Sequence, residues 1–101
     1  MTNPRFMLIV ATDVAGEMEE EFNKWYDNEH IPGLLKVPGV LNAQRYISVN
    51  GSPKYFAIYG HENEYVQEKE EYKKILNTDW TKRIRPHLKN FKRFFLKKYE
   101  G

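Results

Sequence analysis

The chain has 101 residues, a net charge of +2, and a composition that is 30% charged and 41% hydrophobic, typical of one folded domain. It has no cysteine, so disulfides, zinc-thiolate sites and thiol nucleophiles are excluded. The longest apolar run, residues 6–11, is about a third of the length that a membrane-spanning helix needs. No signal-peptide pattern precedes this run, and we expect a cytoplasmic protein.

The sequence pattern alternates between strands and helices. Short β-rich runs predict strands, and apolar residues at helical spacing after acidic first turns predict helices. The pair Pro32-Gly33 is expected to break or restart the first helix, and Asn63 to cap the second. In chain order, we expect a strand at 5–11, a helix at 17–30, strands at 40–49 and 55–59 joined by a turn at 50–53, a helix at 63–76 and a strand at 88–99.

This β-α-β-β-α-β order predicts a single α+β domain over residues 1–101, with a ferredoxin-like fold and an antiparallel sheet. Both faces of the expected strands are apolar: Leu8 and Val10 lie on one face of the first strand, and Met7 and Ile9 on the other. Two helices can cover only one face of such a sheet. We therefore expect a homodimer in which a second copy covers the other face, giving a dimeric α/β barrel.

A longer motif supports the same fold. The segment at 21–32, EFNKWYDNEHIP, is followed by VPGV at 37–40 and QRY at 44–46. This pattern resembles the EthD-like branch of the dimeric α/β barrel superfamily, and the resemblance spans nearly the whole chain. It implies a ligand pocket between the helices and the sheet of each protomer. The superfamily includes cofactor-free oxygenases, haem-degrading enzymes, polyketide cyclases, lactone isomerases and dehalogenating enzymes.

His30 is the best candidate for an acid/base residue. Phe22, Tyr26 and His30 are four residues apart and share a helical face, with Trp25 beside them. An imidazole of ordinary pKa, about 6.5, moves protons readily near neutral pH. The alternative is a core stripe ending in a histidine that bonds a carbonyl group or the helix end.

Four further side chains are candidates for the site. Arg45 lies among apolar residues of the same strand parity, so it either pairs with a helix glutamate or anchors a substrate carboxylate or enolate. With Tyr46 it could steady an oxyanion, although core or interface packing is the alternative for Tyr46 and Tyr59. Trp80 is either a pocket wall or a hydrophobic plug. The expected ligand-binding set is Phe22, Trp25, Tyr26, Tyr59 and Trp80.

We expect no metal and no bound cofactor. His61 and His87 follow and precede expected strands, where solvated loop positions are anticipated, and no histidine has a metal-binding spacing such as H-E-x-x-H. The sequence contains neither a phosphate-binding glycine loop nor a Gly-x-Ser-x-Gly motif, which disfavours nucleotide-dependent and triad hydrolases. A haem bound by a histidine remains an alternative, because the sequence does not distinguish a haem ligand from a proton-transferring histidine.

Three functions compete. The leading one is a cofactor-free isomerase, cyclase, dehydratase or oxygenase acting on a small apolar or aromatic molecule. The second is a ligand carrier or structural dimer that transforms nothing. The third, disfavoured, is an RNA-binding domain, because residues 54–59, KYFAIY, loosely echo the central RNA-recognition motif and residues 89–98 are basic and aromatic.

Overall fold

The computed structural model describes residues 4–101, which form a four-stranded sheet with a layer of short helices. The strands are β1 (Phe6–Val14), β2 (Val40–Ile47), β3 (Tyr55–His61) and β4 (Leu88–Lys97); the helices are α1 (Glu19–Trp25), α2 (Ile31–Leu35), α3 (Glu70–Leu76) and α4 (Asp79–Ile84). A π-helical segment, Tyr26–His30, joins α1 to α2, and 3-10 turns occupy Gly16–Met18, Val66–Glu68 and Arg85–His87.

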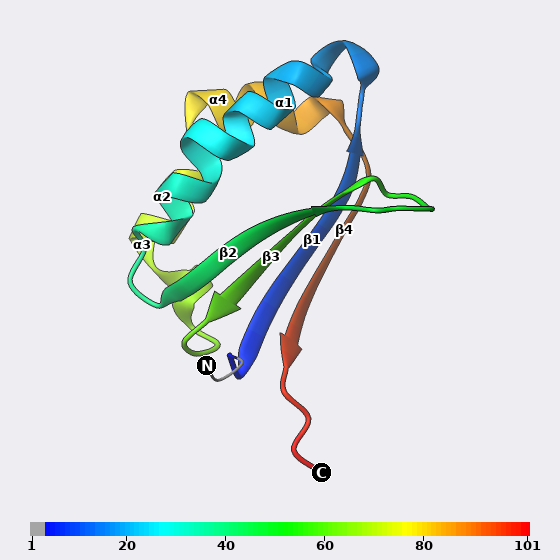
Figure 1. Ribbon diagram of the computed structural model, residues 1–101. Coiled ribbons are helices and arrows are strands. Elements are labelled where there is room, and N and C mark those ends of the chain that lie inside the picture. The colour runs from blue at the N-terminus through cyan, green and yellow to red at the C-terminus, as the bar shows by residue number, and fades with distance from the viewer. Residues whose placement is uncertain (1–3) are drawn as a thin grey trace.

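The sheet has the strand order β2-β3-β1-β4, and every neighbouring pair is antiparallel. All the helices lie over one face of this sheet, as Figure 1 shows. The two crossovers, β1 to β2 and β3 to β4, each carry helices, which is the ferredoxin-like arrangement. The predicted α+β fold class, with its β-α-β-β-α-β order along the chain and its antiparallel sheet, is therefore confirmed.

The core lies between the helices and the sheet. Alternate residues of the strands point toward the helices, so Leu8 of β1 and its cross-strand neighbour Tyr59 of β3 are both buried. Phe22 of α1 and Ile84 of α4 are fully buried against them. Burying a side chain of this size stabilises the fold by roughly 1.5–3 kcal/mol.

The opposite face of the sheet is apolar and has no helix over it (Figure 1). Phe94 and Leu96 of β4 are about half exposed there. Their partners in the β1 register, Ile9 and Met7, share that face because strand side chains alternate. The second apolar face expected from the sequence is thus present and uncovered by helices.

The first helical segment changes its hydrogen-bonding pattern where His30 lies. The backbone N–H of Ile31 donates to the carbonyl of Tyr26, five residues back, which widens the helix into a π turn. Pro32 favours this widening, since it has no N–H to offer the Asn28 carbonyl and its ring would meet that carbonyl in a regular helix. Pro32 therefore does not end the helix, which continues as α2.

The second helix begins later than predicted. Asn63 does not cap it: its Oδ1 accepts a hydrogen bond from the Tyr65 N–H at 2.8 Å, and Lys69 is extended, so α3 begins at Glu70. The stretch around Trp80, which lies between the predicted second helix and the predicted last strand, is helical; the Thr78 hydroxyl caps α4 by accepting from the Thr81 N–H at 3.1 Å. None of the helices within residues 4–101 combines the length and apolarity needed to span a bilayer.

Candidate functional site

A cavity of about 200 Å³ lies between the helices and the sheet. Its sheet side comes from β1, β3 and β4, and its helix side from α1, the π segment, α2, α3 and α4. Most of the lining is apolar or aromatic. Five of the eight residues selected from the sequence border it together: Phe22, Trp25, Tyr26, His30 and Tyr59. The structure thus gathers them into one place, while their roles stay a prediction.

His30 borders the cavity from the end of the π segment, and only 7% of its surface is exposed. Its Nδ1 atom is buried without a hydrogen-bond partner. Burial, reinforced by the positive charge of Arg85, lowers the pKa of His30 to about 4. The imidazole is therefore neutral at physiological pH. The alternative in which His30 bonds a carbonyl group is not observed at Nδ1, which has no hydrogen-bond partner.

The His30 ring is held by aromatic neighbours. It stacks on the Trp25 indole, with ring centroids 4.3 Å apart, and meets Tyr26 edge-on at 5.3 Å. The indole N–H of Trp25 donates to the Thr81 hydroxyl at 3.1 Å, which ties α1 to α4. Thr81 in turn donates to the Ile75 carbonyl at 3.2 Å. These contacts together hold the Trp25 indole, and with it the His30 ring, in place.

Tyr59 supplies a second buried polar group in the cavity wall. Its side chain is 1% exposed, and its hydroxyl makes no hydrogen bond of ordinary length, although the Tyr26 hydroxyl is close enough to add to the effect of burial on its pKa. Burial raises the pKa of Tyr59 well above its ordinary value, and burial also raises the pKa of Tyr26 to about 12. Both hydroxyls stay protonated at neutral pH. Buried polar groups are almost always hydrogen-bonded, so orphaned ones in a cavity wall call for a partner.

Arg45 and Tyr46 lie apart from His30. Neither borders this cavity, and Tyr46 is 53% exposed on β2. Arg45 points toward the helices as its strand parity predicted, but it pairs with Asp27 at 3.0 Å rather than with a glutamate. It also donates to Asn23 Oδ1 at 2.7 Å, and its guanidinium group lies 4.6 Å from the Tyr26 ring centroid. The partners satisfy the Arg45 charge within the protein.

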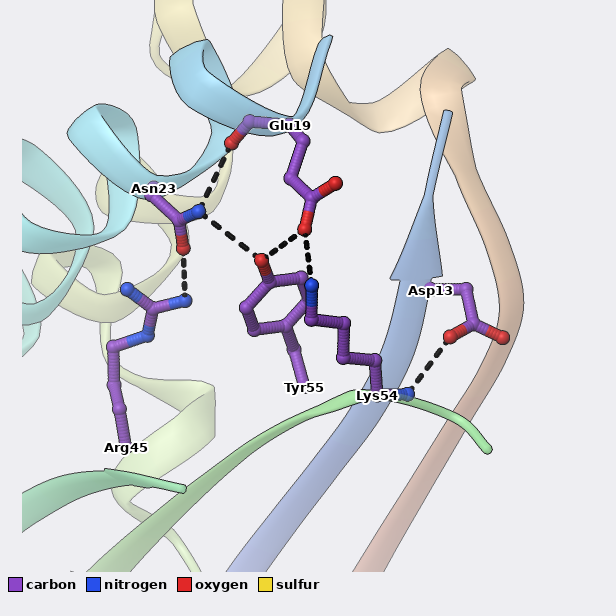
Figure 2. A network of polar contacts seen from close by, with 6 residues as sticks. All are labelled: Asp13, Glu19, Asn23, Arg45, Lys54 and Tyr55. Atoms are coloured by element: carbon purple, nitrogen blue, oxygen red, sulfur yellow. Dashed lines mark hydrogen bonds and ion pairs between the residues drawn. The ribbon is translucent and has the colours of Figure 1, made fainter. Parts of the chain in front are cut away.

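Arg45 belongs to a network of polar contacts shown in Figure 2. The Asn23 amide donates to the Tyr55 hydroxyl at 3.2 Å, and that hydroxyl donates to Glu19. The Lys54 ammonium group pairs with the same carboxylate at 2.7 Å. The network links α1 to β2 and β3, and so supports the helix that carries Trp25 and the π segment.

Trp80 and His61 do not lie where the sequence predicted. Trp80 packs against the core from α4 but does not border the cavity, and its indole N–H is buried without a partner. His61 is not a solvated loop residue, and that prediction is wrong. It ends β3 with 1% of its surface exposed, next to the rings of Tyr72 and Phe95. Burial, followed by the charge of Arg93, lowers the pKa of His61.

Sequence reasoning missed the part of the cavity built by α3, α4 and β4. A β-bulge shapes it: Asn90, with φ of 53°, and Phe91 together oppose Thr12 of β1. Phe91 of the bulge and Arg93 beyond it both border the cavity. Phe91, Arg93 and Phe95 alternate along the strand and so share one face of the sheet. Because a phenylalanine such as Phe95 is expected in the core, this alternation could have indicated that the other two face the helices. The missed residues of this part are Tyr72, Leu76, Thr81, Arg85, Leu88, Phe91 and Arg93.

The part of the chain that the structure describes contains no group of three or more histidine, cysteine or carboxylate side chains placed to hold a metal ion.

No family model matches the chain, and no curated protein matches it. Solved structures share its fold. A mutant of MhuD with two manganese protoporphyrin IX bound per active site superimposes with a TM-score of 0.71 and 16% identity, over 95% of this chain and 96% of that one. An antibiotic biosynthesis monooxygenase superimposes with a TM-score of 0.67 and 11% identity, over 94% of this chain and 99% of that chain.

A mutant of SnoaB, a cofactor-independent oxygenase from Streptomyces nogalater, also gives a TM-score of 0.67 and 11% identity, over 95% of this chain and 94% of that chain. A porphyrin exceeds the drug-sized ligands that fill pockets of about 300–1,000 Å³. It does not fit a cavity of about 200 Å³, and we derive no step through haem. At these identities the likenesses show the fold: this chain has the fold of the antibiotic biosynthesis monooxygenases.

Proposed function

We propose that the protein is a small-molecule enzyme that works without a bound cofactor and uses His30 as its acid/base residue. One observation carries this proposal. His30 Nδ1 and the Tyr59 hydroxyl are two buried polar groups without an ordinary hydrogen bond, and both belong to residues that line one mostly apolar cavity. Both atoms are buried behind the cavity surface, and rotation of the two side chains would bring them to the polar atoms of a substrate. Perturbed titratable residues around a cavity are typical of catalytic sites.

The protonation states suggest the chemistry. A neutral His30 can accept a proton, and a protonated Tyr59 can donate a hydrogen bond to an oxygen atom that gains charge. Because a base with a pKa of about 4 binds a proton weakly, the substrate must itself be acidic, as an enol, a phenol or a carbon acid beside a carbonyl is. Proton removal followed by redelivery would make the enzyme an isomerase, cyclase or dehydratase.

An oxygenase is the second reaction class that the comparisons favour. SnoaB is described as a cofactor-independent oxygenase and shares this fold. Deprotonating an acidic aromatic substrate at His30 would leave an electron-rich carbanion or phenolate, the form that reacts with oxygen. Both reaction classes begin with removal of a proton from the substrate, so both require His30 to act as a base. Membership of the EthD-like branch is part of this proposal.

We further propose that the protein works as a homodimer assembled through its sheets. The uncovered sheet face carries Met7, Ile9, Phe94 and Leu96, and an open apolar face of this kind is an aggregation liability in a monomer. A second copy related by a two-fold axis would cover it with an identical apolar surface. The cavity lies on the other side of the sheet, so such pairing would leave its mouth accessible.

A non-catalytic ligand-binding dimer is the alternative from another class. It uses the same cavity and differs only in leaving its ligand unchanged. The RNA-binding alternative is weakened, because Tyr55 and Tyr59, the tyrosines of the segment that echoes an RNA-recognition motif, are buried beneath the helices. RNA-recognition domains stack bases on aromatic side chains displayed at the sheet surface.

Native mass spectrometry of the purified protein tests the proposal, since it reports oligomer mass and retained small molecules together. A dimer carrying a small aromatic or other apolar compound is the expected result. A monomer that carries RNA instead would overturn both the dimer and the enzyme. A dimer whose retained compound is left unchanged by the protein, under air and across pH 5–9, would favour the ligand carrier.

A further inference from the structure

The mouth of the cavity carries two positive charges. Arg85, in the turn after α4, and Arg93 of β4 both border the cavity and are exposed, as is Phe91 beside them. The remaining lining residues are buried or half-buried. The cavity therefore meets solvent where the two guanidinium groups lie.

These two charges lack a carboxylate partner. Within residues 4–101, no aspartate or glutamate borders the cavity, and neither Arg85 nor Arg93 forms an ion pair. Arg45 gives the contrast, since its charge is met by Asp27. Arg85 is held in place by donating from Nη2 to the Leu76 carbonyl, which leaves its other N–H groups available.

The fields of both arginines reach into the protein. Arg85 contributes to the lowered pKa of His30, and Arg93 to the lowered pKa of His61, in each case after burial. A partly enclosed apolar cavity screens charge less than bulk water does, so it concentrates this positive potential. An anion entering the cavity would be stabilised there, and a cation would be repelled.

The volume limits the size of the ligand. An engineered protein cavity of about 150 Å³ binds benzene, and the cavity here is about 200 Å³. The interior can therefore hold one six-membered ring, or an apolar group of that size, with a small substituent reaching the mouth. Aromatic side chains line the interior, while the charged side chains lie at the entrance.

Resting on the proposed function and naming its substrate class, we infer that the cavity takes a small organic acid: one ring or an equivalent apolar body that carries a carboxylate. The apolar body lies against Trp25 and His30, and the carboxylate lies at the mouth between Arg85 and Arg93. A guanidinium group matches a carboxylate with two parallel N–H donors, which fixes the orientation of the ligand. The bound anion also offsets the Arg85 charge felt by His30, which makes the imidazole a stronger base when the site is filled.

Binding of benzoate and of benzamide, two planar molecules of nearly the same shape, tests this inference by calorimetry and by chemical-shift changes at cavity residues. We expect benzoate to bind about tenfold more tightly than benzamide, as charge-assisted hydrogen bonds predict. Arg85→Gln and Arg93→Gln should each lower benzoate affinity more than benzamide affinity and so reduce this preference. Arg83→Gln removes the same charge from an exposed position on α4 that does not border the cavity, and it should preserve the preference.

Equal affinity for the two probes would overturn the carboxylate assignment while leaving a ligand cavity and the role of His30 intact. Loss of the preference in the Arg83 variant as strongly as in the other two would also overturn it, because the effect would then come from overall charge. Binding of neither probe at millimolar concentration would overturn the inference as well. The proposed function is judged separately, by turnover of the compound that the protein retains.

Discussion

The His30 imidazole stacks on the Trp25 indole with their ring centroids 4.3 Å apart and their planes inclined by 26°. The indole is itself held by the hydroxyl of Thr81, on a different helix. A neutral imidazole packs well against an aromatic ring in a water-poor wall, whereas its charged form loses hydration there. This contact therefore fixes the position of His30 and contributes to the burial that, together with the Arg85 charge, lowers the pKa of His30.

The first prediction concerns the pH dependence of stability. The pKa of His30 is about 4 in the folded protein and about 6.5 in the unfolded chain, so the unfolded state binds more protons between these values. As the pH falls from 7 to 4, the free energy of unfolding should drop by up to about 3 kcal/mol more in the wild type than in His30→Gln. Denaturant unfolding at a series of pH values measures this difference. Parallel pH profiles for the two proteins would contradict the lowered pKa.

A second prediction concerns the hydrogen bond that holds Trp25. Thr81→Val keeps the side-chain shape but leaves the indole N–H buried without an acceptor, and should lower the free energy of unfolding by about 1–3 kcal/mol. The matched control makes the same change in a Trp25→Phe background, which has no N–H to satisfy. The cost should be smaller there, and an equal cost in both backgrounds would contradict the role assigned to this bond.

The polar network of Figure 2 gives a third prediction. Arg45→Met removes the bonds to Asn23 and Asp27 and the contact with the Tyr26 ring, and should destabilise the fold by about 1–3 kcal/mol. Asp27→Asn removes only the exposed ion-pair partner and should cost less than about 1 kcal/mol. Chemical denaturation of both variants tests the order. Equal losses of stability in the two variants would contradict this order, because the Asp27 ion pair alone would then account for the contribution of Arg45.

A fourth prediction addresses assembly through the uncovered sheet face. Phe94→Lys places a charge on this face, which would be buried and unpaired in a sheet-to-sheet dimer, so the variant should be monomeric. Val49→Lys adds the same charge at a position that is 98% exposed between β2 and β3, and should not change the oligomer. Analytical ultracentrifugation of the wild type and both variants decides the point. A monomeric wild type, or a Phe94 variant that stays dimeric, would contradict sheet pairing.

The sequence could predict the fold because strand alternation and helical spacing carry most of the required information. The spacing of Phe22, Tyr26 and His30 places all three on one cavity wall. The π turn could not be predicted, since spacing alone does not show how the helix adjusts to Pro32. His61 was misplaced because β3 runs two residues beyond the predicted strand, and strand parity then buries His61 with Tyr59.

The remaining cavity residues depend on long-range packing. Arg85 and Arg93 belong to a basic segment whose composition does not distinguish a solvated surface from a cavity mouth. The β-bulge at Asn90 and Phe91 sets which side chains of β4 reach the cavity, and no sequence pattern locates it. For Arg45, the parity gave the correct face of the sheet, but only the structure shows that Asp27 and Asn23 take up its hydrogen-bonding capacity.

The central claim is that His30 moves a proton for a small molecule held in the cavity. The most direct measurement is the rate at which the wild type and His30→Gln convert the compound that co-purifies with the protein, with His87→Gln as the control because His87 does not border the cavity. We expect the His30 variant to lose turnover by about 10²-fold or more, while it stays folded and binds the compound, and the His87 variant to match the wild type. Wild-type turnover in the His30 variant would contradict the account.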